Sequence, residues 1–181
     1  MVTQNIWKSF VKSVAEYNLI DEGDCIAVCI SGGKDSFVLA KCLQRLQFQN
    51  EKAAQSLRGA TATKQSSPAQ FSLKFICMDA GYRKESIKSI KENAKKLEIP
   101  LKFFKTDIFK VVKKAGGSPC YLCARMRRGF LYSTAQKLGC NKIALGHHMS
   151  DVVETTLMGM LYGAQFQVMM PKLKSRNFNG M

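Results

Sequence analysis

The chain has 181 residues, of which 46% are hydrophobic and 23% charged, as is usual for a globular protein with one core. Its 28 lysines and arginines exceed its 13 acidic residues, and the formal charge of +15 indicates either a polyanionic partner or simply solvated lysine faces. The sequence contains no run of 18 apolar residues and no signal-peptide core, so we expect a cytoplasmic protein with reduced cysteines and no membrane contact.

Helical and strand patterns alternate along the chain. Apolar spacing predicts helices over residues 5–17, 35–48, 84–97, 118–139 and 151–162, and apolar runs predict strands over 24–30, 72–79, 100–107 and 141–146. A stretch rich in Ser, Thr, Ala and Gln predicts a flexible insertion near 49–70. We therefore expect one α/β domain over residues 1–181, with a parallel sheet of about four to five strands and helices on both faces.

Small and polar residues follow the ends of the four predicted strands. These residues are Ser31-Gly32-Gly33, Asp79-Ala80-Gly81, Thr106-Asp107 and Gly146-His147-His148. In a parallel sheet, ligands bind beyond the carboxyl ends of the strands. We expect the functional site along that edge.

The segment "SGGKDS", residues 31–36, is a glycine turn between a predicted strand and a predicted helix. Such a turn directs backbone N–H groups and the positive end of the helix dipole at one point, which favours an anion. Its spacing fits neither the loop of mononucleotide triphosphatases nor the dinucleotide fingerprint. It resembles the pyrophosphate loop of the PP-loop ATP pyrophosphatases, whose signature is Ser-Gly-Gly-x-Asp-Ser. A plain strand-end turn is the alternative that six residues leave open.

The resemblance to PP-loop enzymes implies roles for the residues of this loop. Those that would hold ATP and its ion are Ser31, Gly32, Gly33, Lys34, Asp35 and Ser36. Lys34 would add positive charge, and Asp35 would bind Mg²⁺ and act in catalysis. Enzymes of this kind attach AMP to a substrate oxygen and release pyrophosphate. By position, Asp79 either lies near the nucleotide or forms a strand-end turn.

Cys120 and Cys123 lie three residues apart at the start of a predicted helix and are followed by Arg125, Arg127 and Arg128. A helix dipole and guanidinium groups both lower the pKa of a thiol, so we expect thiolate character there. A zinc site needs four ligands, and the chain's two histidines are adjacent instead of three to five residues apart. A redox disulfide and a pair of core cysteines stay open as alternatives.

Three separate motifs carry a narrower resemblance. The segments "PCYLCARMRRGFLY", "ALGHHMSDVVETTLMGMLYG" and "MMPKLKS" resemble the TtcA family of tRNA 2-thiocytidine synthetases, in the same order along the chain. The family patterns are Cys-x-x-Cys-x-Arg-x-Arg-Arg-Gly and Gly-His-His-x-x-Asp-x-x-x-Thr. This resemblance also implies a PP-loop, adenine nucleotide alpha hydrolase-like fold.

The TtcA resemblance implies further site residues and cofactors. Cys120 and Cys123 would be catalytic ligands of a [4Fe–4S] cluster that presents sulfide to an adenylated cytidine in the tRNA anticodon loop. Gly146, His147 and Asp151 would line the nucleotide site, with Asp151 sharing the magnesium ion. The residues that would contact the RNA are Arg125, Arg127 and Arg128.

The sequence departs from the TtcA pattern in two ways. Ser150 stands where the family commonly has an acid. A third cluster cysteine and a C-terminal basic region of the family are missing, so we expect the chain to be the N-terminal catalytic part of a longer protein. A homodimer would be one source of the missing thiolates.

The resulting hypothesis is an ATP-dependent tRNA thiolation enzyme. Its cofactors would be ATP, Mg²⁺ and the cluster, and its partners tRNA and a sulfur donor, either a cysteine desulfurase or free sulfide. One alternative is a PP-loop enzyme that adenylates a small carboxylate or amide. The other is a tRNA-binding fragment without catalysis.

Overall fold

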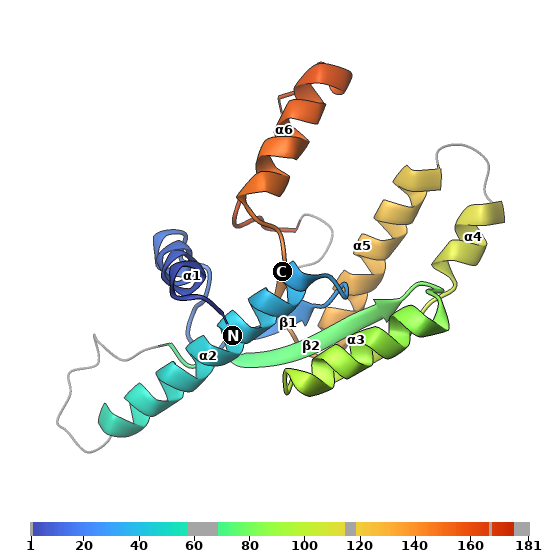
Figure 1. Cartoon of the computed structure of the whole chain (residues 1–181). Helices are drawn as coiled ribbons and strands as arrows, with labels where there is room; N and C mark the ends of the chain where they lie inside the picture. The colour runs from blue at the N-terminus through green and yellow to red at the C-terminus, as the bar shows by residue number, and fades with distance from the viewer. Residues whose placement is uncertain (1, 58–68, 115–118, 167, 176–181) are drawn as a thin grey trace.

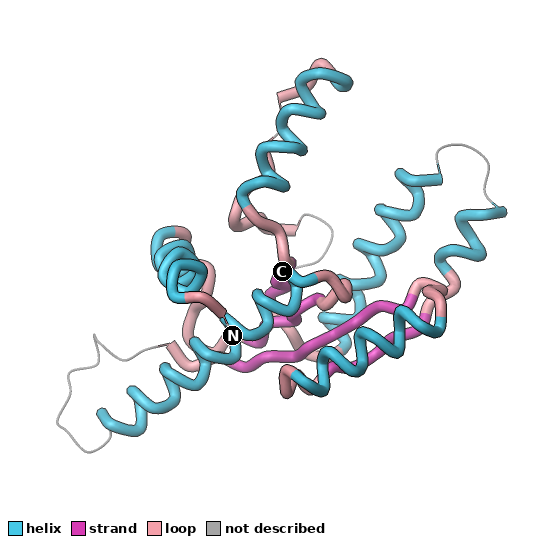
Figure 2. Tube along the Cα trace, viewed as in Figure 1, coloured by secondary structure: helices cyan, strands magenta, loops and turns pink. Residues whose placement is uncertain are grey.

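The protein is built around one small parallel sheet. The computed structural model describes residues 2–57, 69–114, 119–166 and 168–175, and Figures 1 and 2 show their arrangement. Its four strands have the order β3-β2-β1-β4, and each neighbouring pair is parallel. The strands are β1 (Cys25–Cys29), β2 (Ser72–Asp79), β3 (Leu101–Lys105) and β4 (Lys142–Leu145). This arrangement confirms the predicted fold class.

Helices precede, connect and follow these strands. In the described residues they are α1 (Gln4–Glu16), α2 (Lys34–Leu57), α3 (Lys84–Lys96), α4 (Ile108–Lys114), α5 (Pro119–Lys137) and α6 (Met149–Gly163). Sequence patterns predicted all of these except α4. With seven residues, α4 is too short for helical periodicity to be visible in its sequence.

The predicted insertion near 49–70 needs a correction. α2 continues to Leu57, so residues 49–57 are helical where we expected irregular chain. The physical reason is that Glu, Lys, Ala, Gln and Leu, which make up residues 51–57 except for Ser56, are strong helix formers. Two side-chain hydrogen bonds join α2 to the residues before β2. The Asn50 side-chain amide donates to the Ala69 carbonyl at 2.8 Å, and the Gln70 side-chain amide donates to the Asn50 carbonyl at 3.1 Å. Residues 58–68 lie outside the described residues.

Helices cover both faces of the sheet because alternate strand residues point to opposite faces. On one face, Ile26 and Val28 of β1 belong to a core formed with α2 and α3. On the other face, Ala27 and Cys29 pack in a second core with Ala135 of α5. Figure 1 shows α2 and α3 in front of the sheet and α5 behind it. The predicted two-sided covering is therefore confirmed.

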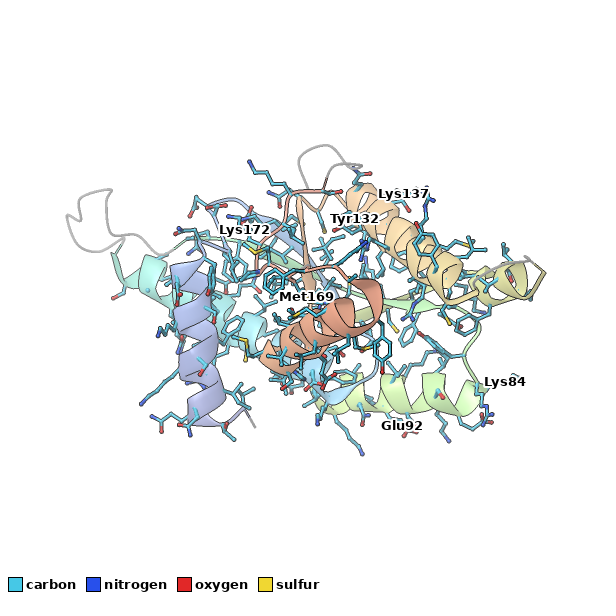
Figure 3. The ribbon with its side chains drawn as sticks, turned by 90° about the horizontal axis from the view of Figure 1, so that it is seen from above. Lys84, Glu92, Tyr132, Lys137, Met169 and Lys172 are labelled. Atoms are coloured by element: carbon cyan, nitrogen blue, oxygen red, sulfur yellow. The ribbon has the colours of Figure 1, made fainter. Side chains whose placement is uncertain are left out.

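The last helix, α6, follows β4 and projects away from the sheet (Figure 1). Seen from above, it falls between α3, marked by Lys84 and Glu92, and α5, marked by Tyr132 and Lys137 (Figure 3). Its apolar side chains are largely exposed, for example Leu161. None of the helices in the described part of the chain is long and apolar enough to span a membrane.

Candidate active site

The glycine turn after β1 is held in one conformation by its neighbours. Gly32 has a φ of +94°, and a Cβ added to it would lie 2.7 Å from side-chain carbons of Ile90 in α3. Ser36 is 3% exposed, and its hydroxyl donates to the Gly33 carbonyl at 2.8 Å and accepts from the Ser31 N–H at 3.3 Å. Only glycine fits at position 32, and the turn is fixed at the start of α2, whose first N–H groups have no partner within the helix.

The end of β4 packs directly on this turn. A Cβ added to Gly146 would lie 2.9 Å from the backbone N and Cα of Ser36 and 3.1 Å from the carbonyl carbon of Asp35. The missing side chain therefore allows the end of β4 to approach the start of α2 closely. This contact brings the first residues of α6 next to the phosphate loop.

Two carboxylates and one imidazole meet at this approach. The Nε2 atom of His148 lies 4.0 Å from Oδ2 of Asp35, and its Nδ1 atom lies 3.4 Å from Oδ2 of Asp151. The His148 N–H also donates to Asp151 Oδ2 at 2.7 Å. All three side chains are more than a third exposed: His148 at 49%, Asp35 at 43% and Asp151 at 36%. A bound ligand can therefore reach them.

The histidine between the carboxylates is His148, whereas the sequence led us to choose His147. His147 is exposed, and its N–H donates to the Leu145 carbonyl at 2.9 Å. A signal for His148 was present in the sequence, because it precedes Asp151 by three residues at a helix start, where side chains and backbone pair. A nucleotide contact of His147 stays a prediction.

The donor set suits a magnesium ion held together with phosphate. Mg²⁺ prefers carboxylate oxygens and is usually bound through one or two of them plus phosphate oxygens. Asp35 and Asp151 supply two carboxylates on either side of His148. No group of three or more His, Cys, Asp or Glu side chains in the described residues is arranged to hold a metal alone. The ion would therefore need the oxygens of a bound nucleotide.

Asp79 organises the loop that follows β2. Its Oδ1 atom accepts from the N–H groups of Gly81 and Tyr82 at 3.0 and 3.1 Å. This is the strand-end turn that the sequence left open. A nucleotide or metal contact of Asp79 stays a prediction.

A cavity of about 400 Å³ opens beside the phosphate loop. It is lined by Ser31, Gly32, Tyr82, Ser86, Ser89, Ile90 and Asn93. Sequence reasoning identified the loop residues but missed the polar side chains of α3. Their spacing of three and four residues places them along one side of the helix, beside the apolar stripe that we did predict.

The cysteine pair lies at the start of α5. Cys120 is exposed, and half-buried Cys123 packs against a cluster that includes Met78 and Ile108. Burial raises the pKa of the Cys29 and Cys140 thiols to about 12, so these core cysteines stay protonated. Among the described cysteines, Cys120 is the exposed one, whereas Cys25 and Cys123 are half-buried.

The cysteine pair does not complete the predicted cluster site. A [4Fe–4S] cluster normally takes four thiolates, and the start of α5 supplies Cys120 and Cys123. No described histidine, cysteine or carboxylate group adds to them. The side chains present therefore do not fit a complete cluster site.

The three arginines of the motif have different surroundings. Arg125 and Arg128 are exposed. Arg127 is half-buried, and its guanidinium donates to the Tyr82 hydroxyl at 3.3 Å. The exposed pair suits contact with a polyanion, whereas Arg127 is engaged within the protein.

Comparison with known proteins agrees with this geometry. Residues 3–180 match the model of the PP-loop domain. The chain belongs to the PP-loop family. This membership confirms the predicted resemblance to PP-loop proteins and supports the use of ATP.

Relatives of this PP-loop protein extend the comparison. It is 37% identical over 167 residues to "tRNA-cytidine(32) 2-sulfurtransferase" of Erwinia tasmaniensis, covering 91% of this chain and 48% of the relative. A protein of the same name in Neisseria gonorrhoeae is 37% identical over 171 residues, covering 91% and 47%. A protein of that name in Aeromonas hydrophila is 38% identical over 167 residues, covering 91% of this chain and 50% of the relative. These matches confirm the TtcA resemblance, and the chain spans about half the length of these relatives.

Proposed function

We propose that this chain carries the adenylating site of a tRNA thiolation enzyme that converts a cytidine of the anticodon loop to 2-thiocytidine. The observation that carries this proposal is the junction of the phosphate loop with Asp35, His148 and Asp151. The relatives support the proposal, because proteins about 37% identical to this chain over 91% of its length are named tRNA-cytidine(32) 2-sulfurtransferase.

ATP would bind along the carboxyl edge of the sheet. Its triphosphate would lie on the N–H groups of residues 31–36, with Lys34 supplying positive charge. Its nucleoside would enter the cavity of about 400 Å³, where Ser86, Ser89 and Asn93 offer hydrogen-bonding groups. Such a size is ordinary for a small-molecule site. Asp35 and Asp151 would hold Mg²⁺ on the phosphates.

The adenylation step needs positive groups around the leaving pyrophosphate. The C2 carbonyl oxygen of the cytidine attacks the α-phosphorus of ATP, and the bond between that phosphorus and pyrophosphate breaks. Charge that develops on pyrophosphate is stabilised by the loop N–H groups and Lys34. The product is a cytidine whose oxygen carries AMP.

Sulfur replaces the activated oxygen in the second step. A hydrosulfide ion adds to C2, loses its proton, and AMP departs with the former carbonyl oxygen. If the donor instead leaves a persulfide on Cys120 or Cys123, the other cysteine releases the sulfur by forming a disulfide, which an external thiol reduces. The structure supports this role because Cys120 is exposed. No step here requires the incomplete cluster.

The partners follow from charge and chemistry. tRNA would contact the basic surface, including Arg125 and Arg128, and the sulfur would come from a cysteine desulfurase or from sulfide. A homodimer that shares cysteine pairs would offer four thiolates, and its iron content after anaerobic reconstitution would rise with protein concentration. We expect the reaction in the cytoplasm, where tRNA is modified.

The test is reconstitution with the purified chain, ATP, Mg²⁺, tRNA and sulfide. We expect tRNA-dependent release of pyrophosphate and AMP, and 2-thiocytidine in the nucleosides measured by mass spectrometry. Pyrophosphate release with a small carboxylate or amide and without tRNA would instead establish the first alternative. tRNA binding without any ATP consumption would establish the non-catalytic alternative.

A further inference from the structure

Tyr82 connects the cavity beside the phosphate loop with two helices. Tyr82 is one of the residues that line the cavity. Its ring lies edge-on to Phe109 of α4, with centroids 5.7 Å apart and an interplanar angle of 83°. Its hydroxyl accepts the hydrogen bond from Arg127 of α5 at 3.3 Å. The turn made by Asp79 fixes its backbone. A ligand that enters the cavity therefore meets a side chain already bonded to α5.

Arg127 and Cys123 share one side of α5. They are four residues apart, so their side chains lie one above the other on the helix. Cys123 packs with Met78 of β2 and Ile108 of α4, which places this side against the protein. Arg125 and Arg128 are exposed on the other side. Arg127 therefore belongs to the cysteine side and not to the exposed basic side.

We propose that Tyr82 and Arg127 are positioning residues that link the nucleotide cavity to the cysteine pair. Binding in the cavity would set the Tyr82 ring, and the hydrogen bond to Arg127 would then set the side of α5 that carries Cys123. A planar guanidinium that donates to a partly buried hydroxyl suits this task, because a hydrogen bond weakens steeply when its angle departs from linear. The inference rests on the proposed function, since it concerns the place where sulfur meets the activated base.

The link predicts a loss in turnover instead of a loss in binding. Misplacing reacting groups by about 1 Å lowers a rate by about 100-fold even when binding is unchanged. Tyr82→Phe removes only the hydroxyl and keeps the ring against Phe109. We expect it to lower the kcat of tRNA thiolation about tenfold or more, and to leave the KM for ATP and the affinity for tRNA unchanged.

A double-mutant cycle separates the link from two independent roles. Tyr82→Phe, Arg127→Gln and the double variant should show the same reduced kcat, because each breaks the same hydrogen bond. Arg127→Lys, which retains a charged donor on a longer side chain than Gln, should recover part of the rate. Tyr17→Phe is the matched control: it makes the same chemical change at an exposed position directly after the end of α1 and should leave all parameters unchanged.

A second readout does not require thiolation. The rate at which iodoacetamide alkylates Cys123, followed by peptide mass spectrometry, should change when ATP is added to the unmodified protein. Tyr82→Phe should abolish that effect of ATP while ATP still binds, as measured by calorimetry. Arg127→Gln should leave the salt dependence of tRNA binding unaltered, since Arg127 would not contact phosphate.

The outcomes distinguish this inference from the proposed function. Additive losses of kcat in the cycle, or an unchanged alkylation rate on ATP addition in the unmodified protein, would overturn the link and leave thiolation standing. A weaker salt dependence in Arg127→Gln would return Arg127 to the RNA surface and would also overturn it. Absence of thiolation, with the effect of ATP on Cys123 present and lost in Tyr82→Phe, would refute the function and retain the link.

Discussion

The two edges of the sheet use charge in opposite ways. At the amino edge, Lys142 Nζ lies 2.6 Å from carboxylate oxygens of both Asp21 and Asp24, and the side chain of Asp24 is only 4% exposed. At the carboxyl edge, Asp35 and Asp151 are near solvent and face the imidazole of His148. Buried, paired charges fix the structure, whereas exposed carboxylates stay available to a ligand. The amino edge should therefore govern stability, and the carboxyl edge should govern chemistry.

The largest effect that tests this contrast is on ATP turnover. Asp35→Asn keeps the shape of the side chain but removes the charge that would hold Mg²⁺, so we expect turnover to fall by about 100-fold or more. The free energy of unfolding should not change, because Asp35 is 43% exposed. Asp151→Asn should be milder. Turnover is measured as pyrophosphate release, and full activity of Asp35→Asn would refute the role of the loop.

The amino edge should show the reverse pattern. Lys142→Met removes the charged partner of buried Asp24 and leaves it the Asp21 N–H and the Asn141 amide. Removing one partner of a buried ion pair costs about 3–5 kcal/mol. We expect a loss of this size in urea unfolding, with the KM for ATP unchanged. A weakened KM at full stability would show that the two edges are not separate.

The pH dependence of the same variant sharpens the test. Burial by itself raises the pKa of Asp24, but hydrogen bonds from Lys142, the Asp21 N–H and Asn141 outweigh burial and hold the pKa below the ordinary 3.8. Asp24 therefore stabilises the folded protein above that pH, and this contribution is lost as pH falls through the folded pKa. Without Lys142, its hydrogen bond and its charge no longer lower the pKa of Asp24, so the variant loses less stability than the unaltered protein as the pH falls. The stability difference between the proteins should shrink on acidification.

The next effect concerns the contact between the phosphate loop and β4. Gly146→Ala drives a Cβ to 2.9 Å from the backbone of Ser36, so we expect a loss of about 1–3 kcal/mol together with weakened ATP binding. Gly129→Ala is the control, since its Cβ would meet nothing within 4 Å in α5 and should stabilise the helix by about 0.5–1 kcal/mol. Calorimetric titration measures the affinity for ATP, and urea unfolding measures the stability of each variant. Equal effects of the two variants would contradict the close approach at Gly146.

The smallest effect is on the salt dependence of tRNA binding. Each phosphate contact contributes a log–log slope of roughly −0.7 to −0.9, so Arg128→Gln should flatten the slope by about that amount. Arg125→Gln should do the same. Filter binding between low and moderate salt measures the slopes. A slope near zero for the unaltered protein would mean that its basic surface serves only solubility.

Much of the fold was determined by local sequence. Alternating apolar runs and helical stripes predicted the strands and every described helix but α4, because backbone geometry imposes periods of 2 and 3.6 residues on any sequence that buries one side. The turn at residues 31–36 was equally predictable, since its glycines and serines lie within one short segment. Helix propensity also explains α2 beyond residue 48, once composition is not mistaken for flexibility.

Contacts between side chains of distant segments at the site were decided by the tertiary structure. The contact of the end of β4 with α2 places His148, and not His147, beside Asp35. A hydrogen bond to Tyr82, 45 residues earlier in the chain, gives Arg127 different surroundings from Arg128. The sequence shows which residue types are present. A shift of one position along a helix or a strand end, however, changes whether a side chain faces a ligand, the protein interior or solvent. The pairing of His148 with Asp151 had a local signal, but the approach of His148 to Asp35 and the bond of Arg127 to Tyr82 depend on contacts between segments far apart in the chain. No local pattern encodes such contacts.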